Sequence, residues 1–312
     1  MDQIDLAEGG KAAIYKKHYV LIPDDGDSLL WQSVYETARR EAADADACLE
    51  LIQSGESPEY TQADCLQIAI ASQVDGIILK PDGSTEVREL IDQAVEQKIP
   101  VITVLEDDSS SQRISFVGLN SYQMGDTYAD QVLKFLNSGT TRIMVLINSE
   151  SRNPGTNLIY SSMVRSIEQK IPPTQNVRIE AYTIDSSTDF DSEEVIRDIF
   201  LNQDTLPDIL ICMDEVTTEC TYQALLDYNE VGNINIIGFY YSDLILDAVR
   251  KGTIPVTIAL NTEEIGKYSI NALEEYLSLG HASSYYNVNI DIITQENVDS
   301  FTEQEESQVE NS

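Results

Sequence analysis

The stretch HYVLIPDDGDSLLWQSVYETARREAA, residues 18–43, decides the fold. It begins with a short apolar run, which is typical of a buried strand. Small and aliphatic residues then recur at every fourth position, the spacing of one helix face: Leu30, Val34, Ala38 and Ala42. A buried strand followed directly by a helix is one unit of an α/β fold.

The same alternation continues along the chain. Residues 47–105 add strands predicted at 47–52, 76–81 and 99–105 and helices at 59–73 and 84–97. After the apolar run 114–120 the scheme starts again, with helices at 121–138, 156–170, 192–201 and 216–230 and strands at 142–148, 177–184, 208–213 and 235–240. A last helix is predicted at 262–279 and a last strand near 286–293. Apolar strands that alternate with helices predict parallel sheets covered on both faces, so we expect an α/β fold of two similar doubly wound lobes.

The chain of 312 residues is strongly acidic, with 54 Asp and Glu against 19 Lys and Arg and a formal net charge of −35. Such a surface repels a phosphate backbone, and no cluster of basic residues offers a local exception. We therefore expect neither nucleic acid nor an anionic membrane as a partner. No apolar run approaches the length of a membrane span, and the first residues lack the apolar core of a signal peptide.

The sequence gives little support for a metal site or a bound cofactor. The four cysteines show no CxxC spacing, and only His18 and His281 accompany them, so we expect no metal site and no cofactor. A disulfide between Cys48 and Cys65 is left open. Four small buried thiols are the favoured interpretation.

Ligands of open parallel sheets bind beyond the carboxyl ends of the strands. This rule converts the predicted strands into candidate site segments: 24–31, 80–82, 106–108, 148–157, 213–215 and 240–243. We expect these segments to converge on one cleft between the lobes.

The first of these segments contains the block Gly26-Asp27-Ser28-Leu29, which spells the nucleophile motif of the GDSL hydrolases. Such an enzyme also needs an aspartate three residues before a late histidine, because the histidine is the base and the aspartate orients it. The only late histidine is His281, and position 278 is a serine. We therefore favour Ser28 as a helix cap. For Trp31 we favour a platform for the ligand, with a core position as the alternative.

Five segments in the right order resemble the type 1 periplasmic binding proteins, the ribose- and galactose-binding group that is related to the effector domains of lactose-repressor-type regulators. They are VDGIILKPDG (74–83), AVEQKIPVITV (94–104), FVGLNSYQMG (116–125), CMDE (212–215) and IIGFYYSDLILDAVRKGTIPVTIALNTEEIG (236–266). The resemblance spans about residues 17–296.

The resemblance implies two lobes joined by a hinge of three segments, near residues 120, 261 and 284. The expected organisation has an N-terminal extension at 1–16 and an acidic, disordered tail at 297–312. The lobes between them are expected as an N-terminal lobe of 17–119 plus 262–282 and a C-terminal lobe of 121–260 plus 285–296.

In sugar-binding members of this family, charged and planar side chains hold the ligand, and this chain departs from about half of that set. The departures fall at Leu105, Glu106, Asn157, Tyr240 and Leu260. The resemblance still implies ligand-binding residues at nine positions, which are Asp27, Ser28, Trp31, Lys80, Glu106, Asn157, Asp214, Tyr240 and Asn261.

The function implied by the resemblance is that of an extracytoplasmic solute-binding protein, not an enzyme. It is expected to close as a monomer on a small, neutral, sugar-like ligand for an ABC transporter permease or a membrane sensor kinase. An export segment or anchor would then be absent from this sequence. One alternative is a regulator's effector domain without the DNA-binding helices that would precede the first strand. The other is a GDSL hydrolase, although the sequence holds no phosphate loop, metal cluster or triad.

Overall fold

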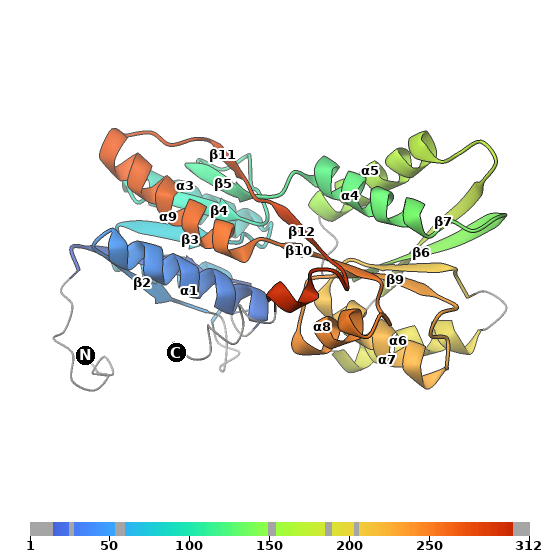
Figure 1. Cartoon of the computed structure of the whole chain (residues 1–312). Helices are drawn as coiled ribbons and strands as arrows, with labels where there is room; N and C mark the ends of the chain where they lie inside the picture. The colour runs from blue at the N-terminus through green and yellow to red at the C-terminus, as the bar shows by residue number, and fades with distance from the viewer. Residues whose placement is uncertain are drawn as a thin grey trace, which may run out of the picture. The chain divides into compact units, whose positions relative to one another are not determined.

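A computed structural model describes residues 15–24, 28–53, 60–148, 154–184, 189–202 and 206–301. The chain divides into two compact units (Figure 1). Unit 1 comprises Met1–Gly118 and Thr262–Val288, and unit 2 comprises Leu119–Asn261 and Asn289–Ser312. The backbone therefore passes from one unit to the other three times.

Unit 1 is built on a six-stranded sheet of order β11-β5-β4-β3-β1-β2, in which every strand pair is parallel. Its strands are β1 (Lys17–Ile22), β2 (Ala47–Leu51), β3 (Gly76–Leu79), β4 (Val101–Val104), β5 (Ser115–Gly118) and β11 (Tyr285–Asn287). Its helices are α1 (Leu29–Asp44), α2 (Gln62–Ala71), α3 (Thr85–Glu96) and α9 (Thr262–Leu279).

Unit 2 repeats this plan with the order β12-β10-β9-β8-β6-β7, and only β12 runs antiparallel to its neighbour. Its strands are β6 (Thr140–Asn148), β7 (Asn176–Ile184), β8 (Ile209–Cys212), β9 (Asn235–Phe239), β10 (Val256–Leu260) and β12 (Ile290–Ile293). Its helices are α4 (Ser121–Lys134), α5 (Pro154–Lys170), α6 (Asp189–Leu201), α7 (Glu215–Asp227) and α8 (Asp243–Arg250).

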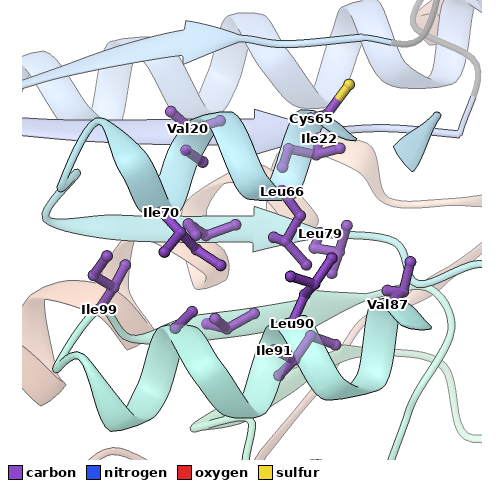
Figure 2. Close-up of a cluster of buried hydrophobic side chains, with 14 of the residues drawn as sticks. Val20, Ile22, Cys65, Leu66, Ile70, Leu79, Val87, Leu90, Ile91 and Ile99 are labelled. Atoms are coloured by element: carbon purple, nitrogen blue, oxygen red, sulfur yellow. The ribbon is translucent and has the colours of Figure 1, made fainter. Parts of the chain in front are cut away.

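The central strands form because they are buried on both faces. All four residues of β3, β4 and β8 are buried, which explains why β3 and β8 are continuous apolar runs and β4 has only the buried Thr103 as a polar residue. In unit 1, α2 packs beside α3 and α1 beside α9. Figure 2 shows side chains of α2 and α3, including Leu66 and Ile91, against Val20 and Leu79 of the sheet. The predicted α/β fold of two doubly wound sheets is confirmed.

The end of the chain differs from the sequence prediction in two respects. The single strand expected near 286–293 is two strands, β11 and β12, which belong to different sheets because the backbone passes between the units at Val288 and Asn289. Residues 285–288 thus belong to unit 1, and the third passage lies a few residues beyond position 284. Helix α8 and strand β10 lie between the predicted strand 235–240 and the predicted helix 262–279, where no further element was predicted.

The disordered tail predicted for 297–312 was wrong for its first five residues. These residues are folded because Val298 is buried and the ring of Phe301 lies 5.7 Å from that of Tyr241. Asp299 also accepts a hydrogen bond from Arg250 at 3.1 Å. Residues 302–312 lie outside the described part of the chain.

The four cysteines are free thiols, so Cys48 and Cys65 do not pair. Cys65 and Cys212 are buried, as expected for structural thiols, whereas Cys48 is exposed and Cys220 is half-buried. The expectation of four buried thiols was therefore wrong for these last two, and for Cys48 the reason is its place on an outward-facing position of the edge strand β2. Among the described residues no helix has the length and apolar character to cross a membrane.

Candidate functional site

Each sheet has a topological switch point, because its first strand lies between the second and the third. In unit 1 β1 lies between β2 and β3, and in unit 2 β6 lies between β7 and β8. At a switch point the connections from two neighbouring strands lead to opposite faces of the sheet. This leaves a crevice at the carboxyl ends of those strands, where open α/β sheets bind ligands. The residues that follow β1, β3 and β8 are therefore the first candidates for ligand binding.

Asp24, which follows β1, is the centre of the polar contacts at this edge of unit 1. Its Oδ1 accepts a hydrogen bond from Trp31 Nε1 at 2.6 Å, and its Oδ2 pairs with Lys80 Nζ beyond β3. Partial burial raises the pKa of Asp24, but the Lys80 charge and the hydrogen bonds from Lys80 and Trp31 outweigh it and hold the pKa below its usual value. The Asp24 carboxyl is therefore ionised at neutral pH, and both of its oxygens have partners within unit 1.

Trp31 is only 2% exposed. The ring is packed into the start of α1 and fixed by its hydrogen bond to Asp24. Of the two interpretations of this residue, a ring buried in this way fits the core position better than the ligand platform. Its contact with Asp24 still connects it to the candidate site.

Ser28 is the N-cap of α1, and its hydroxyl accepts the Trp31 backbone N–H at 3.4 Å. This is the role that the sequence analysis favoured. His281, the residue that a GDSL hydrolase would require as a base, is an exposed residue after α9. Asp27 lies outside the described residues.

The carboxyl end of β4 carries three acidic residues in succession. Asp107 is paired with Arg113, and the buried Asp108 accepts hydrogen bonds from Arg88 Nε at 3.0 and 2.8 Å. Glu106 is half-buried. The sequence analysis did not identify the two arginines, because one lies on a helix and the other in a loop, away from any motif.

A buried carboxylate oxygen follows β8 in unit 2. Asp214 is the N-cap of α7, and its Oδ1 accepts the Thr217 backbone N–H at 2.8 Å. Its Oδ2 is buried and has no hydrogen-bond partner among the described residues. The backbone carbonyl of Asp214 accepts hydrogen bonds from the hydroxyls of Thr217 and Thr218 at 3.1 and 2.7 Å, so the turn is held from two sides.

The environment of Asp214 disfavours its charged form. Burial raises the pKa of this carboxyl, and the hydrogen bonds from Thr217 offset the rise only in part. The ion pairs of the described residues include none with Asp214. A buried acceptor without a donor costs free energy, and the other such side-chain atoms among the described residues are Gln53 Oε1 and Ser115 Oγ, so Asp214 is the one carboxylate in this condition.

Tyr240 lies just beyond β9 in a strained backbone conformation. Its φ is 60°, in the left-handed region that costs a residue with a side chain about 1–2 kcal/mol. The ring is 2% exposed and stacks on Tyr241 with a centroid distance of 4.7 Å. Leu105, the residue beyond the fourth strand of unit 1, has the same conformation, with a φ of 62°. Four other described residues with a side chain, Asp46, Gln73, Lys98 and Asn229, have a positive φ and lie just after helices.

The remaining predicted residues have simpler surroundings. Asn157 is exposed on α5, and its backbone carbonyl accepts the Ser161 hydroxyl at 2.9 Å. Asn261 is half-buried beside a point where the chain passes between the units, and its Nδ2 donates to Asp291 at 3.4 Å. Within unit 1 the structure brings Trp31 and Lys80 together through Asp24, a residue missing from the nine predicted positions. No group of three His, Cys, Asp or Glu in the described ranges is arranged to hold a metal ion.

Replacing Trp31 by alanine distinguishes a core residue from a ligand platform. Because the indole is buried and bonded to Asp24, we expect Trp31→Ala to lower the free energy of unfolding by about 3–5 kcal/mol. Urea denaturation followed by circular dichroism measures the loss. The control is Leu29→Ala on the same helix, where the side chain is 41% exposed and about 0.5 kcal/mol or less is expected. A loss below about 1 kcal/mol for Trp31→Ala would contradict the core position.

Asp214 predicts a pH dependence of stability. Its pKa is raised above the ordinary 3.8, so the folded state binds its proton more tightly than the unfolded state, and the carboxyl destabilises the fold as the pH rises through this window. Asn lacks this titration and keeps the cap. We therefore expect Asp214→Asn to gain stability relative to the natural chain as the pH rises above the ordinary pKa of an aspartate, in urea denaturation. A difference that does not change with pH, or a change of opposite sign, would show that Asp214 is not buried in this way.

Comparisons with known proteins agree with this architecture. Residues 18–282 match the model of a periplasmic binding protein domain. The comparison with curated proteins finds no match.

Solved structures of the same fold share about a fifth of their residues with this chain. GanP, a glucose-galactose binding protein from Geobacillus stearothermophilus, is matched with a TM-score of 0.79 and 20% identity, over 90% of this chain and 98% of that chain. A periplasmic ribose ABC transporter structure from Conexibacter woesei is matched with a TM-score of 0.79 and 22% identity, over 95% and 97%. A chain of the XylFII-LytSN complex is matched with a TM-score of 0.76 and 20% identity, over 90% and 98%. At these identities the likeness shows a shared fold.

Proposed function

The chain belongs to the family of periplasmic binding protein domains, and from this premise we propose that it binds a small solute outside the cytoplasmic membrane. Each unit offers candidate residues for the solute at the carboxyl ends of its strands. In unit 1 these are Ser28, Lys80 and Glu106, with Asp24 and the buried Trp31 as the residues that position them and Asp27 as a candidate outside the described residues. In unit 2 they are Asn157, Asp214, Tyr240 and Asn261.

The observation that carries this proposal is the Oδ2 atom of Asp214. It is buried at the switch point of its sheet, and the described residues offer it no hydrogen-bond donor. A solute that donates a hydrogen bond there would satisfy the one open acceptor on this turn. This would recover the desolvation cost of about 1–3 kcal/mol that the unliganded protein bears.

The names of the similar structures suggest the kind of partner. They include sugar-binding proteins, a ribose ABC transporter and a complex between XylFII and LytSN. We propose that this chain, as a monomer, presents its solute to a membrane partner, either a transporter permease or a sensor. No described feature favours the hydrolase alternative, because Ser28 is used as a helix cap.

Capture of a solute from a mixture tests the proposal. We expect the folded protein, incubated with the low-mass fraction of yeast extract and desalted, to retain a small molecule in native mass spectrometry. The purified solute should raise the melting temperature, because a ligand that binds only the folded state adds about 2.7 kcal/mol at a hundredfold excess over its Kd.

The matched control for this capture is a pair of isosteric variants. Asp214→Asn should weaken the capture, whereas Asp227→Asn, an exposed position on the same helix, should leave it unchanged. Retention of no solute, or equal retention by both variants, would contradict the proposed site.

A further inference from the structure

We propose that the group of the solute that contacts Asp214 is a protonated amine, so that the ligand class is a small aminated molecule and not a neutral sugar. This inference rests on the proposed function and goes beyond it by stating the charge of the ligand.

The first support is the distribution of charge partners at the strand ends. In unit 1 three carboxylates at these ends have their own cations: Asp24 has Lys80, Asp107 has Arg113 and Asp108 has Arg88. Asp214 has no basic partner among the described residues. Of these four carboxylates, Asp214 is the one without a cation, and its Oδ2 is buried with no hydrogen-bond partner among the described residues.

The second support is the chemistry of the groups around Asp214. Cys212 precedes it, and burial raises the pKa of this thiol to about 12, so the thiol is neutral. The hydroxyl of Tyr128, also neutral, donates to the Cys212 carbonyl at 3.2 Å. The charged groups nearest in the chain, Glu215 and Glu219, are acidic like Asp214 itself. A positive charge supplied by the ligand is therefore complementary to this region.

The third support is the position of Asp214 at the start of α7. The Thr217 N–H and the helix dipole act on Oδ1 and offset in part the burial that disfavours the carboxylate, whereas Oδ2 receives no such donor from the described residues. A hydroxyl and an ammonium group both form charge-assisted hydrogen bonds with a carboxylate, but only the ammonium adds the attraction between opposite charges. In a buried setting the ammonium also supplies the counter-charge that such a carboxylate requires.

The neighbouring strand ends in unit 2 are poorly suited to a molecule with many hydroxyls. Beyond β9 lies the buried ring of Tyr240, and β10 ends in Leu260, which is 5% exposed. Ser242 uses its hydroxyl to bond Glu219. Each hydroxyl of a sugar that is buried here without a partner would cost free energy, whereas an amine attached to a largely apolar frame needs fewer acceptors.

Matched amine and hydroxyl pairs test the inference. Calorimetric titrations would use glucosamine against glucose, galactosamine against galactose, and phenylethylamine against phenylethanol, at a pH at which the amines are protonated. We expect at least one amine to bind about tenfold or more tightly than its hydroxyl partner. In Asp214→Asn, which keeps the helix cap and removes the charge, this preference should disappear, and in Asp227→Asn it should remain.

The results that would overturn this inference can be distinguished from those that would overturn the proposed function. Equal or tighter binding of the hydroxyl members, or a preference for amines that survives in Asp214→Asn, overturns the inference. A panel in which no amine binds also overturns it. If the protein then captures a neutral solute from yeast extract in an Asp214-dependent manner, the proposed function stands without the inference, whereas capture of nothing removes both.

Discussion

The burial of parallel strands on both faces is the constraint on which the rest of this structure depends. Strands such as β3, β4 and β8 have no polar face, so helices must cover both sides of each sheet. Polar side chains can then gather only where the strands end. Because parallel strands end at the same edge, the chain places Asp24 beside Lys80 in unit 1 and Asp214 beyond β8 in unit 2.

The strand ends differ in how their charges are satisfied. In unit 1 the acidic residues at the strand ends form ion pairs with Lys80, Arg88 and Arg113. Both members of each pair lie in unit 1, so these pairs stabilise the fold as well as shaping a site. In Asp214, Oδ1 accepts the hydrogen bond of the helix cap, whereas Oδ2 is buried without a hydrogen-bond donor among the described residues. The helix cap holds this carboxyl in place, and its Oδ2 can accept a hydrogen bond from a ligand.

Much of the fold could be predicted from the sequence because it follows from local patterns. The apolar runs and the helical spacing of residues such as Val34 and Ala38 gave the strand and helix order, and Ser28 was identified as a cap from its place before that pattern. The structure of the C-terminal end of the chain was harder to predict. The segment 286–293 alternates apolar and polar residues without interruption up to Ile292, and nothing local shows that the backbone changes sheets at Val288. Val298 is buried by tertiary contacts that composition does not reveal.

The site was predictable only in outline, because spacing locates strand ends but not the contacts made there. Trp31 lies beside the apolar stripe of its helix, which suggested an accessible ring, yet a hydrogen bond to Asp24 holds it in the interior. The left-handed backbone of Leu105 and Tyr240 has no sequence signal, since neither is a glycine. Asp214 was identified through the CMDE segment, but its unsatisfied oxygen is visible only in three dimensions.

Hydrogen exchange of the full chain, measured with and without the captured solute, tests most directly the claim that the carboxyl ends of the strands bind it. The account predicts slower exchange in the segments that follow β1, β3, β8 and β9, with the strongest protection at Asp214–Thr218. It predicts no change at the opposite ends of the strands, in the turns before β2, β3 and β9. Protection confined to those opposite turns, or to helix surfaces such as α2 and α3, would contradict it.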